Sequence, residues 1–459
     1  MSSVATLHRT LQTLRSRLNG RVIGPDDAAY DTARALFYGW IDRRPAAIVK
    51  VSNATDVVHV VTTARDAGVP LAVRSGGHSV AGHSMCDGGI VLDLSDMRKL
   101  EIDSANRTAW AETGLTAVQY TVASAEKGLA TGFGDSGSVG IGGITLGGGI
   151  GFLVRKYGLT IDDLLAADMV TADGSLLRTD AENHPDLFWA IRGGGGNFGI
   201  ATRFKFRLHR VDNIVGGMLF LPATPATIRD FMALSESAPE ELSTIANVMI
   251  APPMPFIPPG SHGKPIIMGM FVCTGPIDAG ERIVAPFRKL APPIADMLKP
   301  MRYHEMYQEE GPHPAAASLR SMFIDSVDTG TAESILAHLQ ESKAMMSVAQ
   351  LRMLGGAMAR VPSEATAFAH RKRRIMVNLA ALYERPQDSP VYESWVERFT
   401  KDIRRGDANV YVNFLGDEGK DRIRMAYPGT TYDRLADIKA LYDPDNFFKL
   451  NHNILPHAN

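Results

Sequence analysis

The sequence predicts an α+β protein whose two ends build one domain and whose middle builds another. Three observations indicate this fold class. Short strands and helices alternate over residues 41–210, and prolines and longer strands separated by helices follow residue 211. Near residue 408 the pattern changes again, and a tail rich in aromatic and amide side chains is expected to pack on the first domain. At 459 residues the chain is too long for one simple core, so two or three domains are expected.

Composition places the chain among ordinary soluble globular proteins. Apolar residues make up 45% and charged residues 21%, and the formal net charge is −2, so neither nucleic acid nor an anionic membrane is expected as a partner. Cys86 and Cys273 lie far apart in the sequence, which argues against a disulfide framework or a zinc site and fits a reducing, cytoplasmic location. The histidines show no strong metal-ligand spacing, and no apolar run reaches the length of a membrane span.

The first 210 residues are expected to form short elements in the order strand, helix, strand. Asn53 is the expected N-cap of a helix that ends near Gly68. Asp173-Gly174 is a hairpin turn, and Phe204 and Phe206 alternate with charged residues as in a half-buried strand. The expected strands are 46–51, 71–73, 90–94, 108–113, 168–172, 175–177 and 202–208, and the expected helices are 53–67, 118–127 and 186–192.

The middle of the chain predicts an α+β unit on an antiparallel sheet. Its expected strands are 214–221, 266–273, 348–360 and 374–382, and its expected helices are 227–234, 279–290, 333–343 and 392–404. In the C-terminal segment we expect a short strand at 411–414 and a helix at 432–441.

Two glycine-dense stretches organise the first domain. One is Arg74-Ser75-Gly76-Gly77-His78-Ser79, and the other, residues 128–151, holds eleven glycines in twenty-four residues. Such density is typical of close backbone approach to a large flat group, or of turns that need a positive φ. Successive backbone N–H groups can also cradle phosphate. The pair therefore predicts a seat for a dinucleotide, with a set of tight turns as the alternative.

Two short motifs point elsewhere but lack their context. Residues 132–137 and 194–199 both spell G-x-G-x-x-G, yet a nicotinamide site needs a strand before and a helix after, and more glycines follow the first motif instead. Residues 134–137 spell a serine-protease nucleophile motif, which needs a histidine base and belongs to disulfide-bonded secreted proteins. Neither nicotinamide binding nor hydrolysis is therefore expected.

With these residues in place, the chain resembles the berberine bridge enzyme-like flavin oxidases of the vanillyl-alcohol oxidase superfamily, and most of all the bacterial branch that includes hydroxynicotine oxidase. Four blocks in order carry the resemblance: residues 74–79, 139–151 with 156–159, 187–199, and 411–413 together with 442–454. Residues 211–407 match only loosely, at 354–357 and 366–371.

The resemblance implies a PCMH-type FAD-binding domain from residues 1–210, with its core at about 40–210, completed by residues 408–459. Residues 211–407 form the inserted substrate domain, and the flavin ring lies at the interface of the two. The positions that match FAD contacts are Arg74, Ser75, Gly76, Gly77, His78, Ser79, Val80, Gly137, Ser138, Gly142, Gly143, Ile144, Thr145, Leu146, Gly147, Phe152, Ile200, Asn413 and Asn451.

The chain departs from the family pattern in three places. Many members attach FAD through a histidine and a cysteine, but Ser136 stands at the cysteine position, so we expect one covalent link, from His78. Arg352 stands where several members have an acid that serves as base. Residues 318–321 stand where relatives often show an aromatic residue and a lysine lining the pocket.

The expected activity is oxidation of a C–H bond next to oxygen or nitrogen in an alcohol, sugar hemiacetal or cyclic amine, with O₂ as acceptor. In this family a small residue at position 139, here Val139, is associated with oxidases. We expect Tyr411 to act as base with Arg352 lowering its pKa, or Arg352 to bind an acidic substrate; alternatively, Tyr411 packs on the ring and Arg352 forms an ion pair. A dehydrogenase with another acceptor and a non-catalytic flavin-binding protein remain alternatives, and the chain is expected to be a monomer or homodimer.

Overall fold

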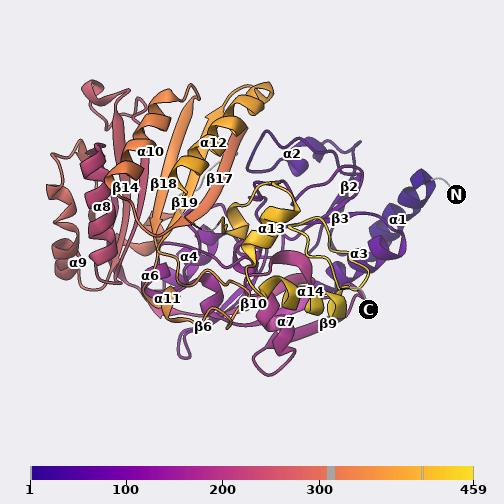
Figure 1. Ribbon diagram of the computed structural model, residues 1–459. Coiled ribbons are helices and arrows are strands. Elements are labelled where there is room, and N and C mark those ends of the chain that lie inside the picture. The colour runs from indigo at the N-terminus through magenta and orange to yellow at the C-terminus, as the bar shows by residue number, and fades with distance from the viewer. Residues whose placement is uncertain (1–2, 308–315, 405, 407, 458–459) are drawn as a thin grey trace.

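The computed structural model describes residues 3–307, 316–404, 406 and 408–457. Figure 1 shows a large sheet with its helices at the left, the N-terminal elements at the right and the C-terminal helices α13 (Lys420–Ala426) and α14 (Thr431–Tyr442) between them. None of the helices in these ranges is long and apolar enough to cross a membrane. No group of three or more His, Cys, Asp or Glu side chains within them could hold a metal ion.

The N-terminal sheet has the order β1-β2-β4-β3, in which β2, β4 and β3 are parallel and β1 is antiparallel. Helix α3 (Ala54–Asp66) begins as predicted, because the Asn53 side chain accepts a hydrogen bond from the Asp56 N–H. Valines of α3 pack on the sheet, and Leu14 of α1 (Ser3–Arg17) packs in the same core. The strands are β1 (Arg21–Ile23), β2 (Ala47–Lys50), β3 (Leu71–Arg74) and β4 (Ile90–Asp93), and α2 (Tyr30–Arg34) lies between β1 and β2.

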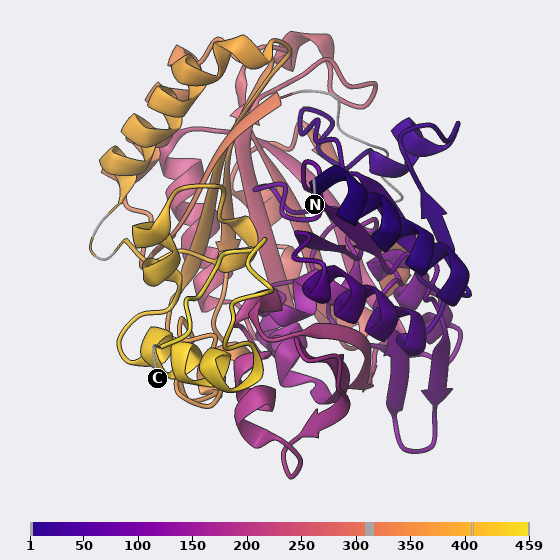
Figure 2. The same cartoon turned by 90° about the vertical axis from the view of Figure 1, so that its right-hand side faces the viewer.

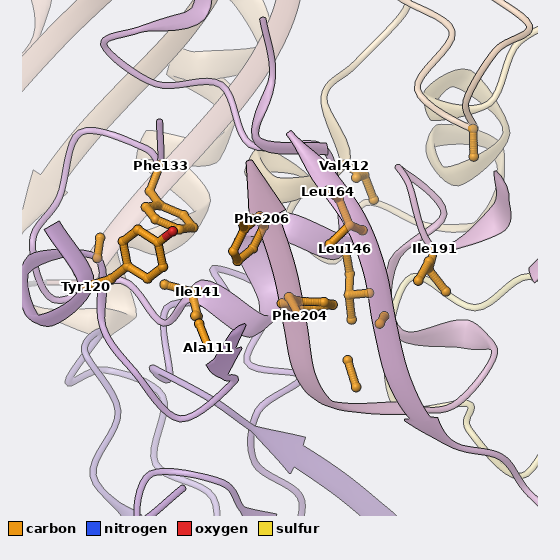
Figure 3. Close-up of a cluster of buried hydrophobic side chains, with 14 of the residues drawn as sticks. Ala111, Tyr120, Phe133, Ile141, Leu146, Leu164, Ile191, Phe204, Phe206 and Val412 are labelled. Carbon is orange, nitrogen blue, oxygen red and sulfur yellow. The ribbon is translucent and has the colours of Figure 1, made fainter. Parts of the chain in front are cut away.

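A second, antiparallel sheet has the order β5-β6-β10-β8-β9. The predicted hairpin at Asp173-Gly174 is confirmed by the pairing of β8 with β9. Phe204 and Phe206 are fully buried, and the Phe206 ring meets Phe204, Tyr120 and Phe133 in the core that Figure 3 shows. The elements are β5 (Leu100–Asp103), β6 (Thr108–Glu112), α4 (Ala117–Ala125), β8 (Leu164–Val170), β9 (Leu176–Asp180), α7 (Pro185–Ala190) and β10 (Ile200–Arg207), with β7 (Leu129–Ala130) pairing β11 (His209–Arg210).

The predicted antiparallel sheet in the middle of the chain is confirmed. Its order is β15-β12-β14-β13-β18-β19-β17, with β16 also pairing β12. Four helices pack on one face, and Figure 2 shows the orange helix α12 on the side away from the indigo N-terminal elements. The elements are β12 (Asn213–Pro222), α8 (Pro225–Ser237), β13 (Leu242–Ile250), β14 (Pro265–Thr274), α9 (Ile277–Val284), β15 (Ala295–Asp296), β16 (Lys299–Arg302), β17 (Ala316–Ile324), α10 (Thr329–Glu341), β18 (Met346–Met353), β19 (Ile375–Tyr383) and α12 (Ser389–Ile403).

Three sequence predictions of local structure are wrong, and two strands of the large sheet were missed. Strand β18 ends at Met353, because Gly355 and Gly356 have positive φ and the chain then forms α11 (Ala357–Arg360). Residues 412–414 form a 3₁₀ turn instead of a strand. Strands β13 and β17 were not predicted. We expected further glycines, and not a helix, after the first G-x-G-x-x-G motif, but two short helices form there, α5 (Ile141–Leu146) and α6 (Val154–Tyr157).

The C-terminal tail is held by a buried ammonium group. Lys439 Nζ is fully buried and donates hydrogen bonds to the carbonyl oxygens of Asn197 and Phe448 and to Asp443 Oδ2. Asp443 in turn accepts from the N–H groups of residues 447 and 448. Through Lys439 and Asp443, this network joins residues 447 and 448 of the tail to the Asn197 carbonyl of the glycine loop at 193–199.

Candidate cofactor and substrate site

A cavity of about 590 Å³ lies where the glycine-dense stretches, the C-terminal tail and the large sheet meet. Its size falls in the range of cofactor and small-molecule sites. Of the predicted site residues, the following line it: Ser75, Gly76, Gly77, His78, Ser79, Val80, Val139, Gly142, Gly143, Ile144, Leu146, Ile200, Tyr411, Asn413 and Asn451. The other predicted site residues are not among those that line it: Arg74, Gly137, Ser138, Thr145, Gly147, Phe152 and Arg352.

The two glycine-dense stretches are locked together. Ser75 Oγ donates to the Thr113 carbonyl at 2.6 Å and accepts from the Gly142 N–H at 3.3 Å. A Cβ at Gly76 would lie 2.1 Å from the Gly140 nitrogen, so only glycine allows this approach. Behind the loop, Arg74 forms an ion pair with buried Asp93, with Nη2 and Oδ2 2.6 Å apart. These contacts make a rigid backbone wall rather than a set of separate turns.

The wall leaves room for a flat ligand at specific glycines. Gly143 and Gly196 both line the cavity, and a Cβ at either would meet no atom within 4 Å. The Asn451 side chain donates to the Gly196 carbonyl, while its buried Oδ1 has no hydrogen-bond partner. Open backbone beside an unpaired acceptor fits a dinucleotide. Gly147 has another role, because its missing Cβ makes space for Asn413.

His78 is held as a neutral imidazole in this wall. Its ring stacks on Phe37 with centroids 4.0 Å apart, and its Nε2 lies 3.0 Å from Ser138 Oγ. Burial lowers the pKa of His78 to about 4, because its effect is larger than those of Ser138 and Asp135, which raise this pKa. When Nε2 donates to Ser138, the lone pair lies on Nδ1, so the ring presents a nucleophilic nitrogen at neutral pH.

Tyr411 is buried among hydrogen-bond donors. Its Oη accepts from the Gly149 N–H at 2.8 Å, the Ile150 N–H at 3.3 Å and Asn413 Nδ2 at 2.8 Å. These donors favour the phenolate, but burial outweighs them and raises the pKa of Tyr411 above its ordinary value. Arg352 does act to lower this pKa, as predicted, but its guanidinium is the weakest of the opposing influences and does not offset the effect of burial.

Arg352 is an ion-pair residue, as its alternative interpretation held. The side chain is 2% exposed, and its Nη2 lies 2.7 Å from Asp135 Oδ2 and 2.9 Å from Gln350 Oε1. An acidic substrate would have to displace Asp135 to reach it. Ser318, which matched a pocket-lining position, is also buried and bonds to the Tyr383 hydroxyl instead.

The sequence predictions missed the wall that the large sheet contributes. Asn247, Gln350 and Asn378 line the cavity from three neighbouring strands, together with Met268 and Met270. A signal was present, because Asn247 and Asn378 are single amides within otherwise apolar or small-residue runs. Asp135, His83 and His452 also line the cavity and were not predicted.

Comparison with known proteins identifies the class of enzyme. Residues 45–180 match the model of the FAD-binding domain, and residues 410–455 match the model described as berberine and berberine like. The uncharacterized FAD-linked oxidoreductase YvdP of Bacillus subtilis is 32% identical over 96% of this chain and 99% of its own. The (R)-6-hydroxynicotine oxidase of Paenarthrobacter nicotinovorans is 29% identical over 96% and 97%.

Solved structures agree with these relatives. The 6-hydroxy-D-nicotine oxidase of Arthrobacter nicotinovorans superposes with a TM-score of 0.84 at 27% identity, covering 96% of this chain and 98% of that one. This chain belongs to the berberine bridge enzyme-like family of FAD-linked oxidoreductases. The predicted family, fold class and FAD cofactor are confirmed, and the chain is an enzyme of this class.

Proposed function

We propose that this enzyme oxidises a C–H bond next to oxygen or nitrogen in a small organic substrate, with O₂ as electron acceptor. FAD held by the glycine-dense stretches would supply the redox chemistry, which is a two-electron oxidation of the substrate coupled to reduction of O₂ to H₂O₂. The observation that carries the proposal is that one cavity has two kinds of lining. The glycine-dense stretches, with His78 and Val139, form one side, called here the glycine wall, and the amides of the large sheet form the other, called the sheet wall. Hydroxynicotine oxidase and xylooligosaccharide oxidase, both similar over most of the chain, are oxidases by name.

In this proposal the two chain ends hold the cofactor and the middle holds the substrate. Residues 1–210 and 408–459 supply the glycine wall, Tyr411 and Asn451, and residues 211–407 supply the sheet wall. Asn413 and the N–H groups of residues 149 and 150 keep the Tyr411 phenol oriented. Tyr411 is then the group that accepts the O–H proton of an alcohol substrate.

His78 is proposed as the only covalent attachment point. A glucooligosaccharide oxidase of the same fold, from Acremonium strictum, carries a 6-S-cysteinyl, 8α-N1-histidyl FAD. Here Ser136 lines the cavity at the cysteine position, and a hydroxyl is a far poorer nucleophile than a thiolate. Cys86 and Cys273 are buried thiols whose pKa burial raises to about 11, and neither is among the described residues that line the cavity.

A peroxide screen tests the proposed function. The purified enzyme is mixed with alcohols, sugars and cyclic amines, and H₂O₂ release in air is compared with flavin bleaching under nitrogen. At least one compound is expected to give both signals. Bleaching without peroxide would identify a dehydrogenase that uses another acceptor, and neither signal from any compound would contradict the proposal.

Val139→Leu tests the use of O₂. Val139 is half-buried at the cavity wall, where an added methylene costs about 1–3 kcal/mol of crowding and leaves less room for a diatomic gas. We expect reoxidation of the reduced enzyme by air to slow by roughly tenfold, with anaerobic reduction nearly unchanged. Val118→Leu, at a half-buried valine of α4, is the matched control. Equal reoxidation rates in wild type and Val139→Leu would show that Val139 does not control the reaction with O₂.

A further inference from the structure

The cavity is electrically neutral at physiological pH. Three histidines line it, and burial lowers the pKa of His78 to about 4, of His83 to about 3 and of His452 to about 4. Burial also raises the pKa of two of the tyrosines that line the cavity, Tyr411 and Tyr427. All five side chains are therefore uncharged near pH 7.

The one charged side chain among the described residues that line the cavity is already paired. Asp135 lies 2.7 Å from the buried Arg352 guanidinium, so the two charges cancel at the cavity wall. A substrate carrying a charge would lose water on entering and would find no free counter-charge, which is costly in a buried site.

The sheet wall presents neutral hydrogen-bonding groups in a row. Gln350 is paired in register with Asn247 on one side and with Asn378 on the other, so their side chains share one face of the sheet. Gln350 Nε2 donates to Asn247 Oδ1 at 3.0 Å. Asn378 is 9% exposed, lines the cavity, and its Oδ1 has no hydrogen-bond partner. A buried amide that is left unpaired is a ready site for a ligand group.

We propose that Asn247, Gln350 and Asn378 form a recognition row for an uncharged, hydroxyl-bearing substrate, in preference to a carboxylate or a protonated amine. A hydroxyl both donates and accepts, so it satisfies an amide in either orientation. Met268 stands beside Asn247 in register and gives the row an apolar, polarisable neighbour for the carbon skeleton. This inference rests on the proposed function and narrows its substrate from alcohol, sugar or amine to the hydroxylated compounds.

Three probes that share one ring and differ in charge test the row. D-Glucose, D-glucuronate and D-glucosamine are titrated at pH 6 into the holoenzyme, with its flavin kept reduced under nitrogen so that no turnover adds heat. Calorimetry is expected to show that glucose binds at least tenfold more tightly than either charged probe. Equal or tighter binding of a charged probe, or no measurable binding of glucose, would overturn the inference.

Two substitutions at Asn378 test whether the recognition row causes the preference for glucose over the charged probes. Asn378→Leu removes a hydrogen bond and should weaken glucose binding by about 3- to 10-fold. Asn378→Asp adds a negative charge at nearly constant size and should shift the preference toward glucosamine. Gln340→Leu, at an exposed amide of α10, is the matched control and should bind glucose like wild type. Unchanged glucose binding in both Asn378 variants would contradict the inference. Because binding is measured without turnover, its failure is distinguishable from failure of the proposed function, which the peroxide screen tests separately.

Discussion

Replacing Tyr411 by phenylalanine is expected to slow flavin reduction by an alcohol substrate by two or more orders of magnitude, while covalent FAD stays in place. Oxidation of an alcohol requires that the O–H proton leave as hydride departs, and a positioned base contributes roughly 10²–10⁴ in rate. Tyr411 lines the cavity, and three N–H donors surround its oxygen, which is the arrangement that a phenolate needs. Rapid-mixing measurement of flavin bleaching under nitrogen gives the rate.

The pH dependence of that rate follows from the burial of Tyr411. A base must be deprotonated to act, and burial raises the pKa of Tyr411 above 10, so the deprotonated fraction grows about tenfold per pH unit throughout the neutral range. The rate of flavin reduction by an alcohol should therefore rise with pH up to at least pH 10 without a plateau. In Tyr411→Phe this rate should no longer depend on pH over that range. Tyr383→Phe, which alters a buried tyrosine hydrogen-bonded to Ser318, is the control and should show the same rise of the rate with pH as wild type. A loss below tenfold in Tyr411→Phe at every pH would show that Tyr411 is not the base.

Elements with local signals could be predicted from the sequence. The side chain of Asn53 caps α3, and the Asp173-Gly174 turn joins β8 to β9, because each signal acts over a few residues. Strand β13 was missed because it is buried along nearly its whole length and so lacks the alternation that marks a half-buried strand. The glycine-dense stretch was misjudged because α5 is stabilised by its packing and not by helix propensity.

The candidate site was predictable where one loop carries it and not where distant segments meet. The loop containing His78 was recognisable as a unit. The row of Asn247, Gln350 and Asn378 depends on the register of three strands, and the Asp135–Arg352 pair joins residues 217 positions apart. The raised pKa of Tyr411 likewise follows from its degree of burial, which only the folded structure sets.

His78→Ala is expected to abolish covalent flavin attachment completely. We propose the neutral His78 ring, whose Nε2 lies at hydrogen-bond distance from Ser138 Oγ, as the nucleophile. After acid precipitation, wild type should keep yellow flavin in the pellet and His78→Ala should release it to the supernatant. Cys86→Ala and His83→Ala alter other nucleophiles near the same loop, and both variants should keep the flavin in the pellet. Flavin that washes free from wild type, or stays bound in His78→Ala, would contradict the assignment.

The covalent site can be read most directly from a tryptic peptide map of the wild-type protein. Cleavage after Arg74 and Arg98 gives one peptide, residues 75–98, which contains His78, His83 and Cys86. Cleavage after Lys127 and Arg155 gives another, residues 128–155, which contains Ser136. Mass spectrometry should find FAD on the first peptide alone, with fragmentation placing it on His78. FAD on residues 128–155, on His83 or Cys86, or on no peptide would contradict the proposal that His78 alone attaches the cofactor in this cavity.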